Sequence, residues 1–211
     1  MIEKILKIIF PVSCGICGKI NSKWICPKCY IKIKKELKFY TVTEKDYKLY
    51  FIGFYENLLR KLLLKFKFND SAYLANIFVE LLYKDIAFKE KIEEYDCVIP
   101  VPMYYRNKNI RGYNQTELLA EKISELLKIE YLNNVLIKRF QNQRQSELGE
   151  KNRIENVKNV YFLKDEELIK QKNILLIDDI YTTGSTIREC IKTLKKADIK
   201  NIDVLVIAKR N

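Results

Sequence analysis

Hydrophobic and polar positions alternate with different periods along this chain, and these periods predict its secondary structure. Short apolar or alternating runs predict six strands, at residues 47–55, 96–102, 134–137, 159–163, 173–177 and 202–208. A repeat of three to four residues predicts helices at residues 27–37, 57–68, 71–88, 114–128 and 186–196, with a polar helical connector at 146–152. From residue 96 onward, strands alternate with helices. This order predicts an α/β fold with a parallel sheet covered by helices on both faces.

The length of 211 residues allows one ordinary domain with a small attachment. We expect a small module at residues 1–38, a connecting strand and helices at 39–95, and the α/β domain at 96–211. The longest apolar runs span only a few residues, which excludes a membrane-spanning helix. The apolar start of the chain carries Glu3, Lys4 and Lys7 and has no small-residue cleavage site, so no secretory signal is expected. The predicted location is therefore the cytoplasm, where cysteines stay reduced.

The sequence contains no histidine. This excludes Ser-His-Asp and Cys-His nucleophile systems, histidine metal ligands and an imidazole general base. Any metal ion must therefore be bound by cysteine, aspartate or glutamate.

Four of the six cysteines lie within sixteen residues, as two Cys-x-x-Cys pairs separated by eight residues: Cys14, Cys17, Cys26 and Cys29. Four thiolates at this spacing complete a tetrahedral zinc shell and leave no open position, so the pattern predicts a structural rather than a catalytic zinc ion. A pair of redox dithiols is the alternative. Cys97 and Cys190 fall in strand and helix patterns and are expected in the core.

A second motif follows the apolar strand that ends at Ile177. Asp178 and Asp179 come directly after it, and a loop of small hydroxyl residues then opens the helix at 186. The free amides at a helix start fit a phosphate, and the two acids suit sugar hydroxyls or Mg²⁺ one sugar away. In the alternative interpretation, the acids form a solvated strand end and Thr186 is an ordinary helix cap. A P-loop nucleotidase is excluded, because no Gly-x-x-x-x-Gly-Lys-Ser/Thr occurs.

The segment from Asp178 to Thr186 resembles the phosphoribosyl pyrophosphate (PRPP) loop of type I phosphoribosyltransferases. Nearly the whole chain resembles the ComF/GntX family of competence proteins. Besides that loop and the four cysteines, the resemblance rests on Pro100-Val101-Pro102, Arg111-Gly112-Tyr113-Asn114-Gln115, Arg153 and Asn156-Val157. It implies a type I phosphoribosyltransferase-like sheet flanked by helices, with a small N-terminal zinc module.

The resemblance also implies roles for single residues. Asp178 and Asp179 would hold the ribose 2′ and 3′ hydroxyls of PRPP bound with Mg²⁺, which requires the strand to end near Asp178, because neighbouring strand residues point to opposite faces. The 5′-phosphate would lie in the loop of Thr182, Thr183, Gly184, Ser185 and Thr186. The loop after Ile99 would face the pyrophosphate.

Two arginines after Ile99 fit that pyrophosphate independently. The forked guanidinium groups of Arg106 and Arg111, beside Gly112, suit diphosphate oxygens, and ordinary surface arginines are the alternative. Several purine-transferring members carry an acid at the first loop position. Thr182 occupies it here, and a threonine cannot act as a base at neutral pH.

The net charge of +12 is uneven: residues 1–70 hold 15 Lys or Arg against 6 Asp or Glu. This excess indicates an anionic partner for the N-terminal third, with compositional drift as the alternative. Four lysines lie beside the last zinc ligand, Cys29, and are candidates for contacts with single-stranded DNA: Lys28, Lys32, Lys34 and Lys35.

Two functions remain open at this stage. In one, the protein transfers phosphoribosyl from PRPP to an unidentified acceptor. In the other, it binds incoming single-stranded DNA together with other competence proteins, and the PRPP pocket is a sensor or a relic. The sequence identifies neither the acceptor nor the oligomeric state.

Overall fold

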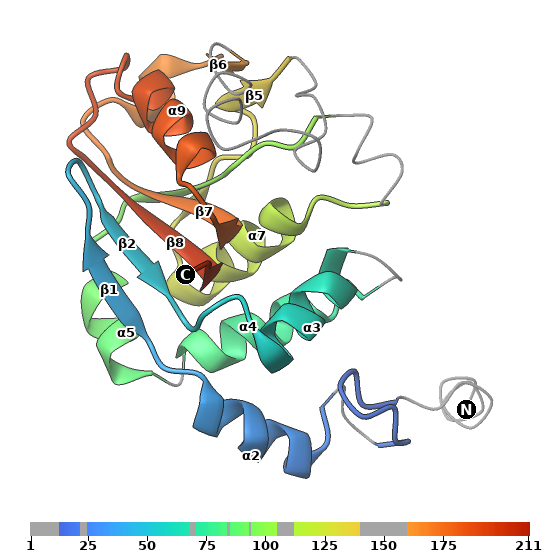
Figure 1. Ribbon diagram of the computed structural model, residues 1–211. Coiled ribbons are helices and arrows are strands. Elements are labelled where there is room, and N and C mark those ends of the chain that lie inside the picture. The colour runs from blue at the N-terminus through green and yellow to red at the C-terminus, as the bar shows by residue number, and fades with distance from the viewer. Residues whose placement is uncertain are drawn as a thin grey trace.

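A six-stranded sheet forms the centre of the protein (Figure 1), in a computed structural model that describes residues 13–21, 25–67, 71–83, 85–92, 94–104, 112–139 and 160–211. Its strands follow the order β1-β2-β8-β7-β3-β4. They are β1 (Tyr40–Thr43), β2 (Lys48–Phe51), β3 (Cys97–Pro100), β4 (Glu130–Tyr131), β7 (Asn173–Tyr181) and β8 (Asn201–Lys209). Only the pairing of β1 with β2 is antiparallel. The predicted α/β fold with a parallel sheet is confirmed.

Helices cover both faces of this sheet (Figure 1). One face packs against α3 (Asn57–Lys67), α4 (Leu74–Tyr83), α5 (Ile86–Ile92) and α7 (Gln115–Leu127). The other face packs against α9 (Ser185–Leu194) and the antiparallel pair β5 (Leu136–Lys138) and β6 (Tyr161–Leu163). The central strands β3, β7 and β8 are therefore buried from both sides, which explains their nearly continuous apolar runs.

The proline that ends β3 is compatible with its central position. Val101 N–H donates to the Ile177 carbonyl at 2.8 Å, so Pro100 directs its nitrogen away from β7. On that other side β4 pairs only with Cys97 and Val98. No ladder bond therefore requires the N–H that proline lacks.

Three elements differ from the sequence-based expectations. The strand expected at 47–55 is present as the shorter β2, but it pairs with a strand that was not expected, β1, and this hairpin extends the sheet beyond β8. The helix expected at 71–88 is two helices, because the Asp85 carboxylate accepts the Phe88 N–H at 3.4 Å and starts a new one. Strand β7 continues past Ile177 to Tyr181, because β8 pairs with it as far as Lys209. The connector expected at 146–152 lies outside the described residues.

The cysteine module and helix α2 (Pro27–Glu36) lie on the same side of the sheet as α3 and α4 and pack against these helices, below them in Figure 1. Ile25 and Ile33 are buried in the same core as α3 and α4. Lys65, on the last turn of α3, donates to the Gly15 carbonyl at 2.5 Å. A Cβ on Gly15 would overlap the Tyr73 hydroxyl, so the lack of a side chain at Gly15 lets the module pack closely against Tyr73. Among the described residues, no helix has the length and apolar character needed to cross a bilayer.

Candidate functional site

A cavity of about 340 Å³ opens at the carboxyl ends of β3 and β7. Its position follows from the topology. The chain leaves β3 through α7 toward β4, whereas it leaves β7 through α9 toward β8 on the opposite side. The two connections cover opposite faces of the sheet and leave a crevice between them, which is where open α/β sheets bind ligands. The amino ends of α7 and α9 both line this cavity.

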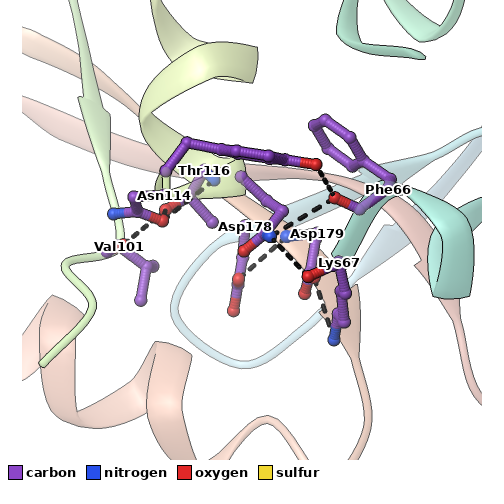
Figure 2. A network of polar contacts seen from close by, with 9 residues as sticks. Phe66, Lys67, Val101, Asn114, Thr116, Asp178 and Asp179 are labelled. Atoms are coloured by element: carbon purple, nitrogen blue, oxygen red, sulfur yellow. Dashed lines mark hydrogen bonds and ion pairs between the residues drawn. The ribbon is translucent and has the colours of Figure 1, made fainter. Parts of the chain in front are cut away.

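Asp178 and Asp179 both line the cavity. The requirement that the strand end near Asp178 is wrong, because β7 continues to Tyr181. The last residue of β3 that pairs with β7 is Pro100, which lies opposite Ile177. Beyond this pair the β3 side of β7 is open, and both carboxylates therefore reach one cavity. On that edge the Asp178 carboxylate accepts the Asp179 N–H at 2.8 Å (Figure 2).

The two acids differ in their electrostatic surroundings. The ammonium of Lys67 lies 2.9 Å from the Asp179 carboxylate (Figure 2). Burial, together with the neighbouring charge of Asp179, raises the pKa of Asp178 to about 7. Lys67 and Lys138 oppose this increase without cancelling it. Asp178 therefore carries a proton part of the time near neutral pH, unless a bound cation or hydroxyl group stabilises its charge.

The phosphate-type loop continues from these acids into α9. Thr182, Gly184, Ser185 and Thr186 line the cavity, whereas Thr183 is not among the lining residues. Thr183 stabilises the loop: its Oγ1 lies 3.0 Å from Ser185 Oγ, and its carbonyl accepts from Arg188 Nη2 at 2.7 Å. Gly184 has φ 71°, and a Cβ there would overlap the Tyr181 hydroxyl. Glycine is thus required by both backbone conformation and space.

Hydrogen bonds connect the amino end of α7 to the end of β3 and the end of α3 on the other side of the cavity (Figure 2). Thr116 Oγ1 donates to the Val101 carbonyl at 2.7 Å. Gln115 Nε2 lies 3.3 Å from the backbone carbonyl oxygens of Phe66 and Lys67. The Tyr113 hydroxyl donates to the same Phe66 carbonyl at 2.5 Å. The segment 113–116 therefore fixes the end of α3, and with it the origin of the Lys67 side chain.

Sequence reasoning missed several residues of the cavity, among them Lys67, Lys138 and Tyr161. The Lys138 ammonium lies 5.3 Å from the centroid of the Tyr161 ring, and burial lowers the pKa of Lys138. No local signal marked these residues, because Lys67 and Lys138 are ordinary lysines in a chain with 39 Lys or Arg. Of the residues expected on the pyrophosphate side, Arg106 and Arg111 lie outside the described residues. Gly112 is exposed, with φ 80°, and does not line the cavity.

The four cysteines of the N-terminal module converge. The sulfurs of Cys14, Cys17, Cys26 and Cys29 all lie within 4.8 Å of one another, and none forms a disulfide. Cys17 Sγ is 3.8 Å from Cys26 Sγ, which matches the edge of about 3.8 Å that Zn–S bonds of about 2.3 Å give a tetrahedron. Cys26 N–H lies 3.4 Å from Cys14 Sγ, the kind of contact that stabilises a thiolate. The residues fit a four-thiolate zinc site, whereas Cys97 and Cys190 are buried in the core.

The basic helix that follows presents its lysines to solvent. Lys28, Lys32, Lys34 and Lys35 are all exposed on α2, whereas Ile33 of the same helix is fully buried. The lysines are therefore available to a partner. None of them lines the cavity described above.

Comparison with known proteins agrees with this architecture. Residues 116–211 match the family model of the phosphoribosyl transferase domain, so the fold is of the phosphoribosyltransferase type. Competence protein F of Haemophilus influenzae is 31% identical over 200 residues, covering 93% of this chain and 84% of that protein. Competence protein ComFC of Streptococcus pneumoniae is 34% identical over 194 residues, covering 90% and 77%. The chain belongs to the ComF family of competence proteins.

Among solved structures, an adenine phosphoribosyltransferase from Thermoanaerobacter pseudethanolicus matches this structure over 85% of this chain and 98% of the other chain. Its sequence identity to this chain is 13% and the TM-score is 0.41.

Proposed function

We propose that this competence-family protein binds PRPP with Mg²⁺ in the cavity at the ends of β3 and β7. One observation carries the proposal: Asp178 and Asp179 line the same cavity as the loop that opens α9. The loop of residues 182–186 supplies hydroxyl and amide donors for the 5′-phosphate. The two carboxylates accept from the ribose 2′ and 3′ hydroxyls, and Arg106, Arg111 and Gly112 remain the proposed diphosphate side.

The same arrangement supports phosphoribosyl transfer. A nucleophilic atom of the acceptor forms a bond to C1 of the ribose, the bond from C1 to the diphosphate oxygen breaks, and pyrophosphate leaves with that electron pair. Mg²⁺, when bound with PRPP, would neutralise part of the diphosphate charge. Lys67, Lys138 and the amino ends of α7 and α9 add positive potential around the cavity, which favours an anionic leaving group. Thr182 supplies no base, so the acceptor must lose its proton elsewhere.

Ligand-induced stabilisation tests the proposal. PRPP with Mg²⁺ at a hundred times its dissociation constant should stabilise the native state by about 2.7 kcal/mol and raise the melting temperature. The double substitution Asp178→Asn and Asp179→Asn should abolish this shift while the protein remains folded. Glu166→Gln with Glu167→Gln is the matched control, because it removes two adjacent exposed acids that do not line the cavity. An equal shift in both variants would contradict the proposed site.

Turnover is tested separately by the release of pyrophosphate. PRPP and Mg²⁺ are incubated with the protein and a panel of nucleobases and nucleic acids. Release that depends on one acceptor supports an enzyme, whereas PRPP binding without release from any acceptor supports a sensor.

The exposed lysines of α2 favour a second candidate function, the binding of single-stranded DNA. Lys28, Lys32, Lys34 and Lys35 lie on solvent-facing positions of one ten-residue helix, where they can follow a phosphate backbone. This surface does not share residues with the cavity, so the two proposed functions can be separated by mutation.

A further inference from the structure

A second cavity, of about 180 Å³, lies between α2, the chain that leads from α2 to β1, and α4. Five apolar side chains line it, among them the aromatic Tyr30 and Phe39, together with the charged Lys34, Lys38 and Asp85. We call it the α2 cavity. Among the described residues, it has no lining residue in common with the cavity at the ends of β3 and β7. The α2 cavity is therefore a separate candidate site.

The apolar lining of the α2 cavity is only partly covered by the protein. Tyr30, Leu37, Phe39 and Leu81 pack against the same core as α3 and α4 but retain partial exposure, whereas Ile52 is buried. Apolar surface in contact with water is unfavourable, and a ligand that covers several such side chains at once removes this cost. The cavity therefore favours a ligand with an apolar face.

Hydrogen bonds and ring contacts fix the walls of this cavity. Lys38 N–H donates to the Ile52 carbonyl at 3.2 Å, which attaches the chain after α2 to the end of β2. The Phe39 ring stacks on Tyr50 with a centroid distance of 5.6 Å, and it lies edge-on to Phe88 at the same distance. Because these contacts hold the ring in place, a flat ligand can bind against it without a large cost in conformational entropy.

The charged residues determine how such a ligand would lie. Lys34 and Lys38 are exposed, and Lys34 also belongs to the basic surface of α2. Asp85 lines the same cavity, and its carboxylate accepts the Phe88 N–H at 3.4 Å. A phosphate deep in the cavity would be repelled by this carboxylate, whereas a phosphate at the exposed ammonium groups would be attracted. The cavity thus matches an uncharged ring carried on an anionic backbone.

We propose that the α2 cavity binds one nucleobase of single-stranded DNA against the rings of Tyr30 and Phe39, while Lys34 and Lys38 contact the adjacent phosphates. The volume suits a single base, since pockets for drug-sized ligands begin at about 300 Å³. Every nucleobase has an aromatic face, so the site binds DNA with little preference for sequence. This inference rests on the proposed DNA-binding function of α2, and it adds a site for a base to the basic surface.

An abasic oligonucleotide separates the contribution of the base from that of the phosphates. The probes are a dT oligonucleotide and an abasic oligonucleotide of the same length, which carries the same phosphates without bases. Tyr30→Leu should bind the dT oligonucleotide at least about fivefold more weakly, because one base–aromatic contact has an effect of this size. Its affinity for the abasic oligonucleotide and its salt slope should stay unchanged. Tyr83→Leu is the matched control, because Tyr83 is exposed on α4 and does not line the cavity.

Two further measurements keep the test independent of a single variant. Phe39→Leu should weaken binding of the dT oligonucleotide in the same way, at a position well separated in sequence from the cysteines. Crosslinking of the wild-type protein requires no substitution at all. Under ultraviolet light, an oligonucleotide that contains 5-bromouracil should crosslink to Tyr30 or Phe39, and mass spectrometry locates the bond. Crosslinks confined to residues 178–186 would place the DNA in the other cavity and overturn the proposal.

The outcomes separate this inference from the function on which it rests. If the wild type binds both oligonucleotides equally well, or if both variants keep full affinity for the dT oligonucleotide, the DNA-binding function stands and the base site is wrong. If the wild type binds neither oligonucleotide, the DNA-binding function itself fails. If binding of poly(glutamate) depends on Tyr30 as strongly as binding of the dT oligonucleotide does, the cavity takes an acidic protein segment and the nucleobase assignment is overturned.

Discussion

Lys67 and Asp179 form an ion pair of 2.9 Å at the cavity, although they belong to segments far apart in the sequence. The side chains are 24% and 13% exposed, so the pair is only partly solvated. Lys67 ends α3, and two residues earlier Lys65 contacts the cysteine module through Gly15. The last turn of α3 therefore contacts both the proposed zinc site and the proposed PRPP site.

Removal of the Lys67 charge should destabilise the ligand-free protein. In Lys67→Met, Asp178 and Asp179 remain adjacent without the Lys67 ammonium. We therefore expect the free energy of unfolding to fall by about 1–2 kcal/mol, which lies between the effects of breaking an exposed and a buried ion pair. Urea unfolding at pH 7.5 measures it. Lys61→Met, at an exposed position of the same helix, should change stability by less than about 0.5 kcal/mol. Equal effects of the two substitutions would show that the ion pair contributes nothing.

Zinc removal should unfold the N-terminal module first. Purified protein should contain one zinc ion per chain, and Cys26→Ser should lose it, because three thiolates no longer close the shell. Since the binding energy of such a site is largely folding energy, proteases should then cut within residues 13–36 while residues 96–211 stay intact. Metal analysis and limited proteolysis measure both. Lys19→Ser, exposed in the same module, is the control and should keep its zinc.

The titration of Asp178 predicts a pH dependence of stability. Its pKa is raised from 3.8 to about 7 in the native state, so between these values the folded protein binds more protons than the unfolded chain. Stability should therefore fall as pH rises from about 4 to about 7, and this contribution should level off above pH 7. Asp179, Lys67 and Lys138 also contribute to the pKa of Asp178, and Asp178 in turn raises the pKa of the buried Cys190 thiol.

Asp178→Asn isolates this contribution, because the amide mimics the protonated acid. At pH 8 the free energy of unfolding of the variant should exceed that of the wild type by at least about 1 kcal/mol, since one pKa unit corresponds to about 1.4 kcal/mol. At pH 4.5 the difference should shrink. Chemical unfolding in EDTA at both pH values measures it, and a difference that is independent of pH would contradict the raised pKa.

Salt dependence separates the proposed DNA surface from the cavity. If α2 binds single-stranded DNA, the logarithm of the affinity should fall with the logarithm of salt concentration, with a slope of about −0.7 per phosphate contacted. The triple substitution of Lys32, Lys34 and Lys35 by glutamine should flatten this slope and leave PRPP binding unchanged. The double asparagine variant of Asp178 and Asp179 should do the reverse. Full mutual displacement of PRPP and DNA would instead show one shared anionic site.

Much of this protein could be predicted from local sequence signals. The Cys-x-x-Cys spacing predicted four convergent sulfurs, because both halves of such a site lie close together along the chain. The apolar strand before Asp178 and the glycine-containing loop after it predicted a strand, a turn and a helix start, because backbone conformation there depends on adjacent residues. The alternation of strands and helices after residue 96 predicted the parallel sheet.

Only the tertiary structure decided which distant residues complete the cavity. Lys67 and Lys138 have the local pattern of surface lysines, and they reach the cavity because α3 and β5 pack on opposite faces of the sheet. The α2 cavity exists only because the segments that carry Tyr30, Phe39 and Leu81 meet in the fold. The β1–β2 hairpin is likewise a tertiary outcome, because β2 is completed by pairing with β8 at the far end of the chain. Local periodicity records which face of an element is buried, but the partner that buries it is determined by packing across the whole sequence.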